Sequence, residues 1–174
     1  MAASPSLAFL FTQRVVVGVG DMAVANNPQI TLSTYALGSC VAVAAYDPAL
    51  KAGGLLHLML PDSSISPAKA SAQPAMFANT GLPLLFRALN GIKVERSRMR
   101  LILAGGASML CNSDMFKIGE RNIKAVSDYL GANGYSARHS VLGGTNNRTL
   151  HLDLATGAVK IKGPNAIDAY SLGA

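Results

Sequence analysis

The chain lacks several features that would place it in a specialised class of protein. Its 174 residues include no tryptophan and only two cysteines, and 14% of them are charged. Apolar runs such as LHLML (56–60) and LILA (101–104) are far shorter than the ~18 to 20 apolar residues of a spanning helix. The first 14 residues carry an apolar patch without the basic segment that opens a secretory signal. We therefore expect a cytoplasmic protein that does not insert into a membrane.

The scarcity of cysteine also argues against a disulfide-stapled scaffold. Cys40 and Cys111 allow one bridge at most, and the cytosol keeps thiols reduced, so we expect two free thiols. Half of the residues are hydrophobic, and a chain of this length can bury about 70% of the surface that it exposes when unfolded. We predict one globular domain over residues 15–174, preceded by a flexible tail over residues 1–14.

Positive charge exceeds negative charge by six, which favours encounters with an acidic partner. Nucleic acid is one candidate for that partner. However, the densest basic run, KVERSRMR (93–100), contains no aromatic side chain on which a base would stack. We interpret this run as a solvated strand edge and expect no nucleic-acid partner.

The order of β-type and helical segments predicts an α+β fold, a single-domain sandwich of largely antiparallel or mixed β-sheet with packed helices. Glycines 18 and 20 break a first strand over 14–25, and polar, proline-rich residues 63–74 form a loop. Gly81 and Pro83 predict a kinked or split helix over 75–91. The other expected strands are 29–36, 40–46, 54–60, 99–107, 135–142, 148–155 and 158–163, the last three forming a meander, and residues 118–134 form a second helix.

A cysteine and a histidine lie on two strands of one predicted hairpin. If the loop is YDPALK (46–51), Ala45 pairs with Ala52 and Cys40 lies opposite His57. Directly opposed residues of antiparallel strands share a face, with Cβ atoms roughly 5 Å apart. We therefore expect a hydrogen bond between thiol and imidazole, provided that the register does not slip by one residue.

Such a pair can act chemically, because a neighbouring base turns a thiol into a nucleophilic thiolate. Thr34 is a candidate to orient the imidazole through its hydroxyl, as the third member of a triad. Gly38 and Ser39 supply a small-residue approach whose backbone N–H groups can hold an oxyanion. Free cysteine and lone histidine are nevertheless often core residues, and spacing alone favours that interpretation.

Four other patterns are weaker. GVGDM (18–22) lacks the third glycine of a dinucleotide loop. His151 and Asp153 share a strand face as metal ligands would, but without a third ligand we interpret them as the polar face of a strand and expect no metal. We take Cys111 as structural. Arg121 and Asn122 either brace the site or satisfy loop carbonyls.

Several motifs, in order, resemble the chemoreceptor glutamine deamidase CheD family of bacterial and archaeal chemotaxis. They are GSCV (38–41), YDP (46–48), GGLLH (53–57) and LMLPD (58–62), followed by LAGGASML (103–110), IGERN (118–122) and GGTNNRTLHLDLATGAVKIK (143–162). The resemblance runs from about Val15 to Lys162. SVLGG and NNR depart from the family pattern, which bears on receptor and partner choice rather than on the triad.

The resemblance implies hydrolysis of receptor glutamine side chains to glutamate through a thioester, and in some members of glutamyl methyl esters. It assigns Cys40 as nucleophile, His57 as base and Thr34 as third member, with no cofactor. It also implies a fold similar to that of deamidases of the cytotoxic necrotizing factor type. The expected partners are chemoreceptor cytoplasmic helices and, where one exists, a CheC-type phosphatase.

Two other functions use the same residues. A non-catalytic adaptor would dock on a receptor or phosphatase, with Cys40 incidental. A redox sensor would use Cys40 as a reactive thiol, since a lowered pKa also favours oxidation.

Overall fold

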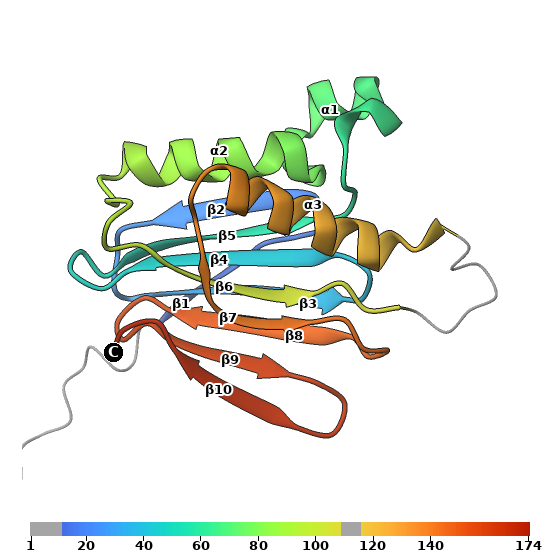
Figure 1. Ribbon diagram of the computed structural model, residues 1–174. Coiled ribbons are helices and arrows are strands. Elements are labelled where there is room, and N and C mark those ends of the chain that lie inside the picture. Colours follow the sequence, from blue (N-terminus) through green and yellow to red (C-terminus); the bar gives the residue numbers. More distant parts are fainter. Residues whose placement is uncertain (1–11, 109–115) are drawn as a thin grey trace, which may run out of the picture.

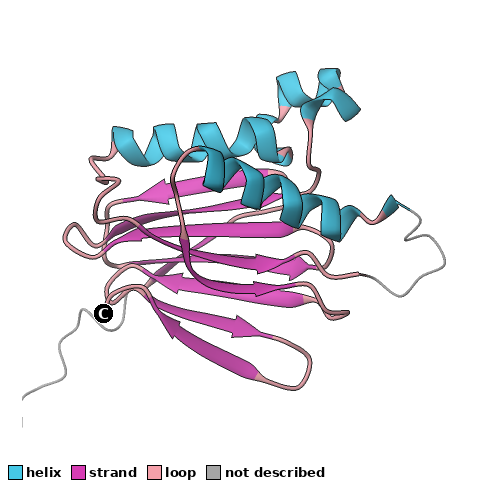
Figure 2. Cartoon of the chain, viewed as in Figure 1, coloured by secondary structure: helices cyan, strands magenta, loops and turns pink. Residues whose placement is uncertain are grey.

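The protein is described from a computed structural model, which covers residues 12–108 and 116–174. Two five-stranded sheets face each other, and the two long helices pack on the far side of one of them (Figure 1, Figure 2). One sheet has the order β2-β5-β4-β6-β7, and we call it the helix-covered sheet. The other has the order β1-β3-β8-β9-β10, and we call it the open sheet. The α+β sandwich expected from the sequence is confirmed.

The bounds of the elements follow in chain order. They are β1 (Gln13–Val16), β2 (Asp21–Ala25), β3 (Ile30–Leu37), β4 (Val41–Asp47), β5 (Ala52–Leu58), the 3₁₀ turn η2 (Ser63–Ile65), α1 (Pro67–Ala72), the 3₁₀ turn η3 (Pro74–Met76), α2 (Ala78–Gly91), β6 (Arg100–Gly105), α3 (Ile118–Ala132), β7 (Ala137–Leu142), β8 (Arg148–Asp153), β9 (Ala158–Lys162) and β10 (Ile167–Ser171).

Strand β4 lies at the centre of the helix-covered sheet and is buried on both faces, which explains its continuous apolar sequence. Its odd-numbered residues, Val41 among them, belong to the core shared with α2 and α3. Its even-numbered residues, such as Ala42 and Ala44, belong to the core between the two sheets. Because side chains alternate along a strand, each apolar core receives every second residue of β4.

The two main helices agree with the sequence. The helix expected over 75–91 is split into η3 and α2, but the break lies at Phe77, whereas Gly81 and Pro83, which predict a kink or a split, lie inside α2. Helix α2 buries Leu82, Leu85 and Leu89 on one face. Helix α3 corresponds to the second predicted helix. The segment 63–74, expected to be a loop, contains the short helix α1. Pro67 at its first turn presets the backbone, and its alanines favour helix.

Three strand predictions need correction. The segment 14–25 forms two strands in different sheets, because the chain turns at Gly20, where φ is +71°. Strand β7 does not form a hairpin with β8. It pairs in parallel with β6, and α3 makes the crossover connection from β6 to β7. The meander consists instead of β8, β9 and β10, and β10 lies in a segment for which the sequence predicted no strand.

The first strand begins inside the segment that is predicted as a tail. Strand β1 starts at Gln13, so residues 13 and 14, which were assigned to the tail, pair with β3. Residues 1–11 lie outside the described part of the chain. In that described part, no helix is both long enough and apolar enough to cross a bilayer.

Candidate functional site

The hairpin that carries the cysteine and the histidine forms as predicted, but its register differs by two residues. Asp47 pairs with Ala52, so the loop has four residues, 48–51. His57 consequently lies opposite Ala42 rather than opposite Cys40. A shift of two positions keeps every side chain on its face. Cys40 and His57 therefore remain on the side of the sheet that faces the open sheet. They are diagonal neighbours, for which the usual backbone spacing between Cα atoms is roughly 7 Å.

Thr34 approaches His57 from the opposite sheet. It lies on β3, and its Oγ1 is 2.7 Å from His57 Nδ1 and 2.7 Å from the carbonyl oxygen of Val17. Both Thr34 and His57 are fully buried. The structure thus brings together two of the three predicted triad residues by a hydrogen bond that crosses the gap between the sheets.

These two contacts fix which nitrogen of the imidazole carries the proton. A hydroxyl has one proton, and the carbonyl of Val17 can only accept, so Thr34 donates to Val17. The Thr34 oxygen must then accept from the N–H of His57 Nδ1. In the neutral ring, Nε2 consequently has a free lone pair, and this buried atom has no hydrogen-bond partner within the described residues. The hydrogen bond expected between Cys40 and His57 is therefore not made.

Cys40 is a half-buried free thiol at the point where the chain passes from the open sheet to the helix-covered sheet. The crossing is held by its carbonyls. Cys40 O accepts from the amide of Gly106 at 2.7 Å, and Gly38 O accepts from the amide of Ala107 at 2.8 Å. Gly105 must be glycine, because its φ is +110° and a Cβ would lie 2.2 Å from Cys40 O.

In this crossing, fewer amide groups than carbonyl groups form hydrogen bonds with the described main chain. Gly38 donates to Ala36 O, but the N–H groups of Ser39 and Cys40 donate to no backbone carbonyl among the residues that the structure covers. Ser39 and Gly38, predicted to line an oxyanion site, therefore lie in the segment that carries the thiol, and the Ser39 amide donates to no main-chain carbonyl of residues 12–108 or 116–174.

Asn122 ties this segment to the histidine strand. Its side-chain nitrogen donates to Ser39 O at 3.0 Å and to Met59 O at 2.8 Å, while its oxygen is buried without a partner in the described chain. Asn122 lies near the start of α3 and is fully buried. Of the two interpretations left open from the sequence, it satisfies loop carbonyls, and these carbonyls adjoin Cys40 and His57. Arg121 is exposed and takes no part in these bonds.

Burial shifts the titration of both reactive groups towards their neutral forms. It lowers the pKa of His57 to about 4, so the imidazole is neutral at pH 7. Burial also raises the pKa of the Cys40 thiol, and the backbone N–H of Cys40 itself offsets part of that rise. A resting site of neutral thiol and neutral imidazole follows, in which the base is ready to accept a proton.

The remaining sequence candidates lie elsewhere. His151 Nδ1 is 2.7 Å from Ser33 Oγ on the outer face of the open sheet, away from Thr34. Asp153 accepts hydrogen bonds from the amide of Ala155 and the hydroxyl of Thr156, within its own turn. Cys111 lies outside the described residues.

Comparison with known proteins gives a consistent result. Residues 59–163 match a family model described as CheD chemotactic sensory transduction, a range that begins after Thr34, Cys40 and His57. A protein of Syntrophus aciditrophicus, described as probable chemoreceptor glutamine deamidase CheD 1, is 45% identical over 148 residues, which cover 85% of this chain and 92% of its own.

Two further relatives are described as probable chemoreceptor glutamine deamidase CheD. The one from Solibacter usitatus is 43% identical over 145 residues, 83% of this chain and 86% of its own. The one from Pyrococcus abyssi is 39% identical over 153 residues, 87% of this chain and 92% of its own. A family model that matches more than half of the chain, together with relatives that match nearly end to end, shows that this protein belongs to the CheD family.

Proposed function

We propose that this protein is a hydrolase that converts glutamine side chains of chemoreceptors to glutamate, with Cys40 as nucleophile, His57 as base and Thr34 as the residue that orients the base. The names of the relatives support the substrate and the reaction. The observation that carries the assignment of residues is the hydrogen bond from His57 Nδ1 to Thr34, because it leaves Nε2 as an unpaired base on the face shared with Cys40.

The first step forms a thioester. The proton of the Cys40 thiol passes to His57 Nε2 as the sulfur bonds to the carboxamide carbon of glutamine. The carboxamide oxygen becomes an oxyanion, for which the Ser39 and Cys40 amides are the proposed donors, each worth ~3 kcal/mol. The imidazolium of His57 then gives its proton to the leaving nitrogen, and ammonia departs.

The second step releases the product. His57 Nε2 takes a proton from water, the hydroxide formed attacks the thioester carbon, and the carbon–sulfur bond breaks. The proton returns to the Cys40 sulfur, and a glutamate side chain is left on the receptor. A glutamyl methyl ester can follow the same path with methanol as leaving group, and we include it as a second proposed substrate.

Binding to a CheC-type phosphatase stays a prediction from the family resemblance. The non-catalytic adaptor is the alternative that an experiment must exclude, since docking alone would not require the bond between Thr34 and His57.

A receptor cytoplasmic fragment tests the proposal directly. We expect the wild-type protein to convert receptor glutamine to glutamate, as read from peptide masses, and the Cys40→Ala variant to lose this conversion. Cys111→Ala is the matched control, because it removes the other thiol and should convert normally. Equal conversion by wild type and Cys40→Ala would refute the role of Cys40. Binding without conversion by either protein would favour the adaptor.

A further inference from the structure

The outer face of the open sheet is covered by no helix of the described residues, because α2 and α3 pack on the other sheet and α1 packs against the 3₁₀ turns η2 and η3 (Figure 1). Its register places Val16, Ser33, His151 and Lys160 in one row across four strands. We call this surface the basic face and define it by six residues: Arg14, Val16, Tyr35, His151, Lys160 and Lys162. Val16 and Tyr35 are 57% and 41% exposed, so the basic face also offers apolar contact area.

Positive charge on the basic face is not neutralised within the protein. Among the described residues, no ion pair involves Arg14, Lys160 or Lys162. The neighbouring carboxylate of Asp153 is occupied by bonds within its turn. The three cations all act on His151. Burial is the main cause of the lowered pKa of His151, and the charges of Arg14, Lys162 and Lys160 are the next causes. A ligand with negative charge is therefore the complement of this surface.

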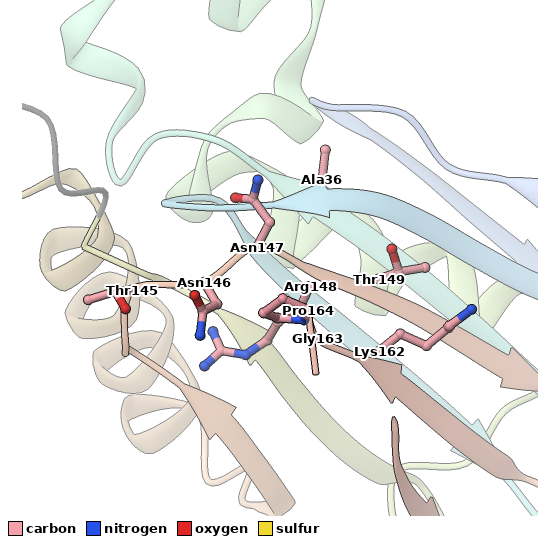
Figure 3. A pocket seen from close by; sticks show the side chains of 9 residues that line it. All are labelled: Ala36, Thr145, Asn146, Asn147, Arg148, Thr149, Lys162, Gly163 and Pro164. Atoms are coloured by element: carbon pink, nitrogen blue, oxygen red, sulfur yellow. The ribbon is translucent and has the colours of Figure 1, made fainter. Parts of the chain in front are cut away.

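Two hollows run along the lysines of β9. One, of about 230 Å³, lies between Arg14 and Lys160, with His151 in its wall. The other, of about 510 Å³, is lined by Ala36, Arg148, Thr149, Lys162, the loop 145–147 and the turn 163–164 (Figure 3). Each hollow thus has a lysine and an arginine in its wall. Asp153 also lines the smaller hollow, and among the described residues no carboxylate lines the larger one.

The larger hollow adjoins the segment that carries the nucleophile. Ala36 lies near the end of β3 and precedes Cys40 by four residues. The Arg148 guanidinium donates to Gly105 O at 3.3 Å, and the next amide, that of Gly106, donates to Cys40 O. A polypeptide that fills this hollow therefore lies beside the chain crossing on which Cys40 is held.

We propose that the basic face binds a helical segment that carries glutamate side chains next to the target glutamine, and that Lys160 and Lys162 each receive one glutamate. This inference rests on the proposed function, because a receptor helix is the substrate there. The two lysines are separated by about 6.6 Å along β9. Glutamates one turn apart on a helix are separated by about 6 Å along its axis, which matches that spacing.

The proposal has a consequence for the order of reaction. Each deamidation replaces a neutral carboxamide on the receptor by a carboxylate, so the product of one event becomes a ligand for the basic face at the next glutamine. A receptor that is already partly deamidated should bind better than one that carries only glutamine.

Binding can be measured without turnover by using the Cys40→Ala variant. The probes are two fluorescent synthetic helical peptides with one target glutamine, which carry either glutamate or glutamine four and eight positions after it, so that the two variable positions are one turn apart. We expect the glutamate peptide to bind about fivefold more tightly at low salt, since each of two exposed ion pairs contributes about 0.5 kcal/mol. Lys160→Gln with Lys162→Gln should abolish this preference.

Arg87→Gln with Lys124→Gln is the matched control, because it removes the same charge from the exposed surface of the helices. This control should keep the preference. The proposal is overturned if both peptides bind equally or if the control loses the preference to the same extent. It is also overturned if the β9 lysine variant changes only the sedimentation of the protein, as for an interface between two copies, or only its binding to duplex DNA.

Wild-type turnover of a receptor fragment separates this inference from the proposed function. Deamidation without any preference for the glutamate peptide refutes the role of the basic face alone. A lysine-dependent preference without deamidation refutes the enzyme and leaves a docking surface for acidic helices.

Discussion

Buried, neutral His57 should make the protein lose stability as the pH falls through the weakly acidic range. An imidazole in the unfolded chain titrates at about 6.5, whereas burial lowers the pKa of folded His57 to about 4. Between these values the unfolded chain holds a proton that the folded chain does not, so acid favours unfolding. The contribution is complete above about pH 6.5 and is lost progressively towards pH 4, at about 1.4 kcal/mol for each pH unit.

Between about pH 6.5 and pH 4 the free energy of unfolding therefore falls by about 3 kcal/mol because of His57, and about 2 kcal/mol of this is lost between pH 7 and pH 5. Urea unfolding at several pH values measures this loss as a decrease in the free energy of unfolding. His57→Gln is the control, because it removes the titration of residue 57 and leaves the rest of the chain unchanged. Parallel curves for the wild type and His57→Gln would refute the assignment of a buried neutral histidine.

Three other predictions concern the same site. Thr34→Val leaves His57 Nδ1 and Val17 O without their partner. A general base accelerates a reaction by about 10²- to 10⁴-fold, so kcat should lose much of this factor while KM changes little. An unchanged kcat would contradict the orienting role. In a Cys111→Ala background, alkylation of Cys40 by iodoacetamide should accelerate up to and beyond about pH 9 because the thiol pKa is raised; a plateau from about pH 6 would instead indicate a preformed thiolate. Asn122→Leu frees the carbonyls of Ser39 and Met59 and should lower both kcat and the free energy of unfolding, the latter by about 1–3 kcal/mol in a urea titration; wild-type values of both would show that the bracing is dispensable.

The sequence predicted the parts of the fold that depend on local pattern. Helices α2 and α3 and the β4–β5 hairpin follow from periodicity and turn residues, because these signals act over a few positions. The break before α2 does not, since it lies at Phe77 and not at Gly81 or Pro83. The sequence failed where pairing is decided at long range. Nothing local distinguishes β7 beside β8 from β7 beside β6, and the short, polar β10 is a strand only because β9 offers it an edge.

The candidate site divides in the same way. The shared face of Cys40 and His57 could be predicted, since it needs only an even shift of register, whereas the register itself depended on how tight the loop after Asp47 is. Thr34 was expected from its proximity to Cys40 and from the family, but its approach from the opposite sheet is a tertiary fact. For Asn122, the sequence signal was its place at the start of a helix, and only the fold shows which two carbonyls it binds.

The hydrogen bond between Thr34 and His57 makes the site a reporter of how the two halves of the sandwich are docked. Neither sheet contains the whole proposed triad, and the chain passes from one sheet to the other beside it at Gly38 to Cys40. An intermediate that keeps one sheet formed but lets the other swing away would retain many of its strands yet have no oriented base. Loss of catalytic competence should therefore mark the earliest separation of the sheets during unfolding, before the loss of secondary structure becomes visible.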